Sequence, residues 1–184
     1  MYRNGDRNQI TFMPPSIEDY VSQDNSVRAY DAFIEAMSLK DLDIKMEDNK
    51  VGNPSYHPKA MIKLFVYGTS YGVRSSRKLE REAVNNLSFI WLLGGLTPDH
   101  KTIAEFRRNN KEPLKKILKQ CARLCVDLDL IDGNMLFVDG TKINANSGIK
   151  SNWTQKRCNK ALKHIDERIN KILAECEQID VEEE

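Results

Sequence analysis

The feature that most constrains the fold is the helical spacing of apolar residues in the second half of the chain. Such residues recur at steps of three and four from residue 114 to 128 and again from 162 to 179. A repeat of this kind places them on one face of an α-helix. In the second segment the steps alternate strictly, as in the seam of a coiled coil or helical hairpin. The seam residues are Leu162, Ile165, Ile169, Ile172, Cys176 and Ile179.

A single helix cannot bury this seam by itself. We therefore expect a long helix over 154–179 to pair with a second helix, either from another chain or from sequence beyond Glu184. The closing stretch EQIDVEEE contains neither a turn signal nor the start of a return helix. The sequence thus predicts that the chain is part of a longer one, and that the seam pairs either with another chain, such as a second copy in a homo-oligomer, or with the later sequence.

The preceding part of the chain predicts shorter helices separated by turns. We expect an irregular arm over 1–15 and a multi-helix domain over 16–130. The helix starts are indicated by capping residues and by a proline suited to a first turn. The stretch LSFIWLLGG is too apolar for a surface, so we expect it at the centre of the helical core, ending at two glycines. The start signals are Asp24, Asn25, Ser26, Pro58, Ser75, Ser76 and Asp99.

The pattern changes after the turn signal at residues 132–134. MLFV and TKI favour strands, and Asp139-Gly140 between them is typical of a hairpin turn. An acid that leaves a strand beside a glycine also suits a metal ion and a phosphate. Phosphoryl transfer on DNA needs two metal ions and normally at least three acids, whereas Asp139 is the one strand-associated acid in the sequence. Local spacing leaves both interpretations open.

The net charge of +1 conceals an uneven distribution. Residues 57–123 carry 14 basic and 5 acidic side chains, a net of +9, while the segments on either side each carry −4. A basic middle third suits a polyanionic partner, although solvated helix faces give the same pattern.

Two stretches within this basic part are candidate DNA contacts. RSSRKLER places cations and hydroxyls at a helix start, where exposed N–H groups and the helix dipole favour phosphate. DHKTIAEFRR has the composition of a recognition helix, and short helices joined by tight turns are the parts of a helix-turn-helix. In the second stretch the candidates lie on the polar face of the expected helix. The candidates of the first stretch are Arg74, Ser75, Ser76, Arg77, Lys78 and Arg81, and those of the second are Lys101, Thr102, Arg107 and Arg108.

Membrane and export signals are not found. No run reaches the roughly 20 apolar residues of a membrane span, and the first ten residues lack the apolar core of a signal peptide. We therefore expect a cytoplasmic protein, associated with the nucleoid if it binds DNA, with no membrane partner.

Several stretches together resemble one known family. The segment YHPKAMIKLFVYGTSYGVRSSRKLEREAVNNLSFIWLLGGLTPDHKTIAEFRR resembles the amino-terminal helical domain of bacterial insertion-sequence transposases of the DDE type. FVDGTKINANSG is similar to the segment that carries the first catalytic Asp of those enzymes. The two segments occur in the family's order.

The resemblance implies a mainly α fold with three parts. They are a DNA-binding domain of several helices, a short β-hairpin over 131–150 that begins an RNase H-like catalytic domain, and a long helix over 151–184 that belongs to a helical insertion. It also implies cleavage and strand transfer of DNA with Mg²⁺ or Mn²⁺. Asp139 would be the first catalytic acid and a metal ligand, and Lys142 would lie near DNA. The family's second Asp and its Glu lie further downstream, so we expect no cleavage by this chain alone.

Three functions follow as hypotheses. The first is an amino-terminal transposase fragment that binds the terminal inverted repeats of an insertion sequence as double-stranded DNA. The second is a non-catalytic DNA-binding protein or transposition inhibitor that acts against the full-length transposase. The third is a helical oligomerisation module that assembles through the 162–179 seam.

Overall fold

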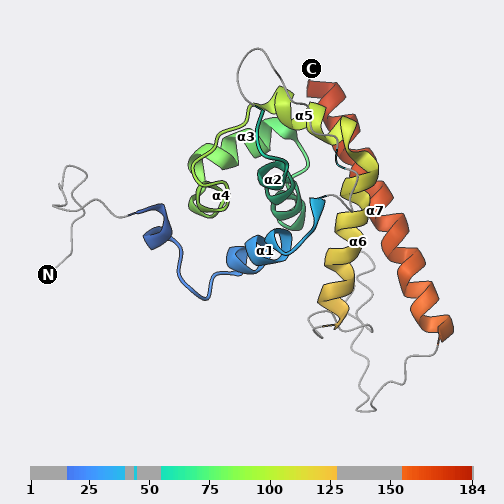
Figure 1. Ribbon diagram of the computed structural model, residues 1–184. Helices are drawn as coiled ribbons and strands as arrows, with labels where there is room; N and C mark the ends of the chain where they lie inside the picture. The colour runs from blue at the N-terminus through green and yellow to red at the C-terminus, as the bar shows by residue number, and fades with distance from the viewer. Residues whose placement is uncertain (1–15, 40–43, 45–54, 128–154, 184) are drawn as a thin grey trace, which may run out of the picture.

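The computed structural model describes residues 16–39, 44, 55–127 and 155–183 of the 184-residue chain. The described part is mainly α, as the sequence predicts, with seven α-helices, one 3₁₀ turn and no strand (Figure 1). The expected β-hairpin over 131–150, with Asp139 and Lys142, lies outside the described residues. In chain order the elements are η1 (Ile17–Tyr20), α1 (Ser26–Glu35), α2 (Pro58–Ser70), α3 (Ser76–Asn85), α4 (Leu87–Leu92), α5 (His100–Asn109), α6 (Lys111–Asp127) and α7 (Gln155–Glu183).

Side-chain caps set the helix starts where the sequence predicts them. Asn25 accepts the N–H of Val27 at the start of α1, and Ser75 accepts that of Lys78 at the start of α3. Each cap satisfies one of the N–H groups that a first helical turn leaves without an intrahelical partner. The predicted stop after α4 is also confirmed, since Gly94 and Gly95 adopt positive φ angles of 60° and 82°.

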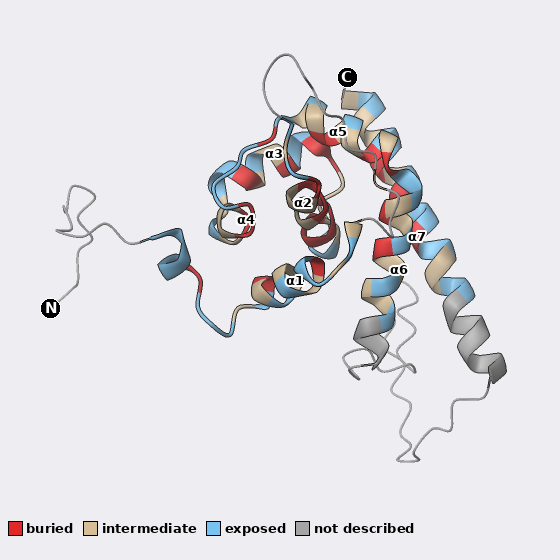
Figure 2. Cartoon of the chain, viewed as in Figure 1, coloured by how far each residue is buried: buried red, intermediate tan, exposed pale blue. Residues whose placement is uncertain are grey.

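Helix α2 forms the centre of the core. It buries eight of its residues, and Figure 2 shows it as the most deeply buried element, with α1, α3 and α4 around it. The expectation that the apolar stretch 87–95 forms this centre is wrong. Leu87 is 52% exposed, and α4 buries only Phe89 and Leu92 against the side of α2. Helix α2 contributes buried side chains to both core clusters, whereas the six-residue α4 contributes to only one of them, so one side of α4 stays exposed.

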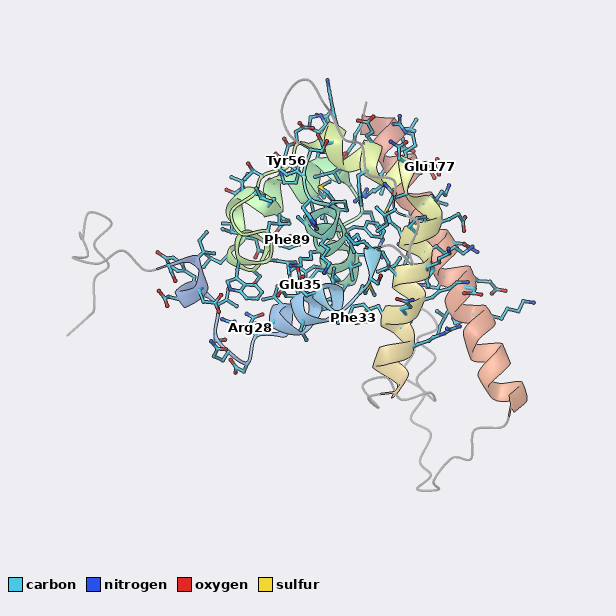
Figure 3. The ribbon with its side chains drawn as sticks, in the orientation of Figure 1. Arg28, Phe33, Glu35, Tyr56, Phe89 and Glu177 are labelled. Carbon is cyan, nitrogen blue, oxygen red and sulfur yellow. The ribbon has the colours of Figure 1, made fainter. Side chains whose placement is uncertain are left out.

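Aromatic side chains join the helices around α2. The ring of Tyr67 on α2 lies 5.3 Å from that of Tyr30 on α1 and 4.8 Å from that of Phe89 on α4, each in an edge-to-face arrangement. Figure 3 shows Phe89 in the interior between the helices. Such pairs add to the apolar burial that holds the elements together. Burial, and the hydrogen bond that its hydroxyl donates to Tyr71, raise the pKa of Tyr67 to about 12.

Helices α6 and α7 form a second layer beside this unit (Figure 1). Ile169, Leu173 and Cys176 of α7 are buried against α6, α2 and α1. The expectation that the covering helix comes from another chain or from later sequence is therefore wrong for this part of the seam. Ile165 and Ile172 pack against the same cluster, Ile179 is half-buried, and the side chain of Leu162 lies outside the described residues.

The buried face of α7 follows the period of a globular helix. Its buried positions include Leu173 in place of the expected Ile172, because the helix packs on a broad surface of several helices. Burial raises the pKa of the Cys176 thiol. None of the described helices is long and apolar enough to cross a membrane.

Candidate nucleic-acid interface

The start of α3 is a polar site at the junction of α3, α5 and α7. After α2 the chain turns at Gly72, which has a φ of 75°, and Ser75 then adopts the extended conformation of an N-cap. The Ser75 hydroxyl accepts the N–H of Lys78 at 3.1 Å. Ser75 and Ser76 are only 2% and 3% exposed. The backbone N–H of Ser76 in this first turn therefore faces protein rather than water.

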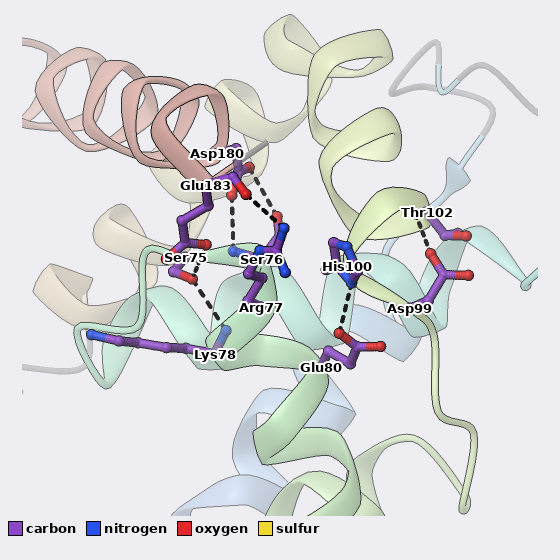
Figure 4. A network of polar contacts seen from close by, with 10 residues as sticks. All are labelled: Ser75, Ser76, Arg77, Lys78, Glu80, Asp99, His100, Thr102, Asp180 and Glu183. Carbon is purple, nitrogen blue, oxygen red and sulfur yellow. Dashed lines mark hydrogen bonds and ion pairs between the residues drawn. The ribbon is translucent and has the colours of Figure 1, made fainter.

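Two acids of α7 fill the site (Figure 4). The carboxylate of Asp180 accepts the backbone N–H of Ser76 at 2.9 Å and the hydroxyl of Ser76 at 2.8 Å. The carboxylate of Glu183 accepts the hydroxyl of Ser75 at 2.6 Å. Arg77 donates to the backbone carbonyl of Glu183, also at 2.6 Å. Negative charge is stabilised at this place by the free N–H groups and the helix dipole.

Arg107 of α5 contacts the same carboxylate of Asp180. Its Nη1 lies 3.0 Å from Oδ2 of Asp180 and 2.7 Å from the carbonyl oxygen of Arg74. The Arg107 side chain is 8% exposed, and its guanidinium lies over the ring of Phe65 at 5.5 Å. Its Nε and Nη2 are buried without an acceptor among the described residues. The guanidinium thus keeps hydrogen-bonding capacity that Asp180 does not use.

A second set of cations lies on the exposed sides of the same helices. On α3 these are Arg77, Lys78 and Arg81, and on α5 they are Lys101 and Arg108. Because α3 and α5 pack against each other, these exposed cations lie on two neighbouring helices. Charged groups on such a surface attract a polyanion over a range set by the salt concentration.

The start of α5 is fixed by two contacts. The Asp99 carboxylate accepts the N–H of Thr102 at 2.7 Å, and this hydrogen bond holds the pKa of Asp99 below its usual range. Nδ1 of His100 lies 2.8 Å from Oε2 of Glu80 and links α5 to α3 (Figure 4). The orientation of α5 relative to α3 is therefore held by side chains at its first turn.

The structure brings together some of the predicted DNA contacts and separates others. Arg74, Ser75, Ser76 and Arg77 surround the junction, and Arg74 also donates to the carbonyl of Thr69. Lys78, Arg81, Lys101 and Arg108 are exposed, and Thr102 is half-buried. The placement of Arg107 on the polar face of α5 is wrong, because this side chain is buried against α7. The helix packs on α3 with one side and on α7 with another, so part of its polar face is covered.

Sequence reasoning did not identify Asp180 and Glu183 as part of the site. The available signal was the charge pattern, since an acidic last third follows a basic middle third. Opposite net charges indicate attraction between segments, but they do not indicate which residues meet.

Metal binding is not indicated within the described ranges. There, no group of three or more His, Cys, Asp or Glu side chains could hold a metal ion. Asp139, the predicted metal ligand, lies outside these ranges.

Comparison with known proteins identifies a protein family. A family model described as Transposase domain (DUF772) matches residues 15–109, more than half of the chain. The matched region runs from just before η1 to the end of α5 and includes the start of α3. No curated protein and no solved structure matches the chain.

Proposed function

The chain belongs to the transposase domain family DUF772, and we propose that it binds double-stranded DNA through the exposed cations of α3 and α5. The observation that carries this proposal is the adjacency of the two helices. Each presents basic side chains, and both lie within the family match. The net charge of +9 over 57–123 provides the sequence-independent attraction that most DNA-binding proteins use.

The two helices have different parts in the proposal. The exposed cations of α3, Arg77, Lys78 and Arg81, contact phosphates and fix the orientation of the protein on the duplex. Helix α5 is the candidate recognition helix of a helix-turn-helix, with Lys101, Glu105 and Arg108 on its exposed side. Such side chains at a groove would read base edges.

The proposed target is the pair of terminal inverted repeats of an insertion sequence, which follows from the resemblance to DDE transposases. By the same resemblance Asp139 is the first of three catalytic acids that hold Mg²⁺ or Mn²⁺ in a full-length enzyme. We propose binding without cleavage for these 184 residues, in company with further copies or with a full-length transposase. Mg²⁺-dependent nicking of terminal-repeat DNA by the purified chain would contradict this part.

A titration with two labelled duplexes tests the proposal. One duplex carries the end of the insertion sequence that encodes the chain, and the other is a scrambled duplex of the same composition. We expect binding to both at low salt and tighter binding to the element end, because base contacts add to phosphate contacts. Equal affinity for the two would refute recognition of the repeats, and no binding to either would refute DNA binding altogether.

A further inference from the structure

The start of α3 holds an intramolecular ligand of a particular chemistry. Two carboxylates of one helix end, those of Asp180 and Glu183, accept hydrogen bonds from both serine hydroxyls and from the N–H of Ser76. Hydroxyls, a free N–H at a helix start and an arginine are also the donors that bind phosphate groups. A DNA phosphate and these carboxylates therefore require the same donors.

We propose that the end of α7 competes with DNA, because Asp180 and Glu183 occupy the place that a DNA phosphate takes at the start of α3. The inference rests on the DNA binding proposed above and adds a means of regulating it. With α7 docked, the exposed cations alone hold the duplex, and binding is weak. When the end of α7 is released, the first turn of α3 and Arg107 join the interface, and binding tightens.

The unused donors of Arg107 independently support the binding of a phosphate in the place that Asp180 occupies. Its side chain is more than nine-tenths buried beside Asp180, yet its Nε and Nη2 lack an acceptor among the described residues. A buried guanidinium with unused donors is unfavourable. A phosphate can accept from two nitrogen atoms of a guanidinium at once, so it would satisfy Arg107 better than Asp180 does.

The end of α7 can leave without exposing the core. Its apolar anchors are Ile169, Leu173 and Cys176, and no apolar side chain from residue 177 to 183 is buried. Val181, for instance, is 64% exposed. The last two turns are therefore held mainly by polar contacts, which a highly charged ligand can replace.

A matched set of three variants tests the competition. Asp180→Asn and Glu183→Gln each remove one negative charge that touches the start of α3. Glu182→Gln removes one from the same helix end, but Glu182 accepts from Gln178 and has no described contact with α3. Each of the three changes removes one negative charge and so raises the general electrostatic attraction to DNA equally. Any further increase in DNA affinity therefore reports the loss of the contact between α7 and the start of α3.

The measurement is the affinity for a short fluorescein-labelled duplex at fixed salt. We expect Asp180→Asn and Glu183→Gln to bind about tenfold more tightly than Glu182→Gln, the equivalent of one charge-assisted hydrogen bond. Thermal melting followed by circular dichroism checks that each variant is folded. If Asp180→Asn does not fold, Glu183→Gln alone tests the competition, because this change leaves the buried ion pair of Asp180 and Arg107 intact.

The possible outcomes separate this inference from the function on which it rests. If the wild type and all three variants bind DNA, and neither Asp180→Asn nor Glu183→Gln binds more tightly than Glu182→Gln, the competition is overturned and DNA binding stands. No binding by the wild type or any variant would overturn both. Binding by Asp180→Asn and Glu183→Gln but not by the wild type would support both.

Discussion

Nη1 of Arg107 lies 3.0 Å from Oδ2 of Asp180, and both side chains are less than a tenth exposed. This ion pair joins α5, which lies inside the region of the family match, to α7, which lies outside it. The same carboxylate also binds Ser76 at the start of α3. The pair thus connects the candidate DNA-binding helices to the acidic helix end that covers them.

Removing both members of this pair should cost less than the sum of the costs of removing each one alone. We expect Asp180→Leu to lower the free energy of unfolding by about 3–5 kcal/mol, because it leaves the Arg107 charge buried and unpaired. The double variant Arg107→Leu, Asp180→Leu should lose clearly less than the sum of the single changes. Urea unfolding of the four proteins gives the coupling energy, and simple additivity would show that the two charges do not interact.

The crossing of α2 and α3 depends on the absence of a side chain at Gly68. A Cβ placed there would lie 2.3 Å from Cδ2 of Leu79, which is fully buried. Alanine gains about 1 kcal/mol of helix propensity, but overpacking a core costs about 1–3 kcal/mol. We expect Gly68→Ala to be destabilised by about 1 kcal/mol in urea unfolding. In the Leu79→Ala background the same change should become stabilising, and a loss there as well would contradict the steric explanation.

The cap of α5 should contribute to stability in a pH-dependent way. Asp99→Ala should cost about 1 kcal/mol at neutral pH, whereas Asp99→Asn keeps an acceptor for Thr102 and costs less. The pKa of Asp99 is lowered in the folded state, so its stabilisation is complete above the ordinary value of 3.8 and is lost as the pH falls through the lower folded value. Equal unfolding free energies for Asp99→Ala and wild type at neutral pH would exclude a capping role.

Glu35 should also contribute to stability in a pH-dependent way. Hydrogen bonds from Lys63 and Lys59 lower the pKa of Glu35 from 4.5 to about 2. The folded value lies below the unfolded one, so the stabilisation is present above pH 4.5 and disappears as the pH falls from there to about 2. We expect the difference in unfolding free energy between wild type and Glu35→Gln to follow this course. The Glu35 side chain is 50% exposed, so added salt should reduce the difference; a difference that is independent of pH would contradict the assignment.

The parts of the fold that local sequence determines could be predicted. Apolar spacing and capping residues identified most helices, including the starts at Asn25, Ser75 and Asp99. These signals act within one or two turns of chain, so they can be read without knowledge of the neighbouring elements. The basic character of α3 and α5 is also a local property and was predicted from composition.

The arrangement of the helices could not be predicted in the same way. Which helix forms the centre depends on the sides from which other elements cover it, and α2 contributes buried side chains to both core clusters whereas residues 87–95 contribute to one. The burial of Arg107 depends on α7, which is 73 residues away in sequence at Asp180. The apolar spacing of α7 predicted that a second helix covers this seam. The spacing does not indicate which helix that is, and in the structure it is α6 of the same chain.

The salt dependence of DNA binding tests the central proposal most directly. The affinity for a short duplex is measured over a series of KCl concentrations for the wild type, for Lys78→Ala with Arg81→Ala, and for the control Lys171→Ala on α7, whose side chain is 69% exposed. We predict that log K falls linearly with log salt for all three. The slope should decrease by about 2 in the double variant, since about 1 is lost for each phosphate contact removed, and should stay unchanged in the control. Undetectable binding by the wild type at the lowest salt, or equal slopes for the wild type and the double variant, would contradict DNA binding through α3 and α5.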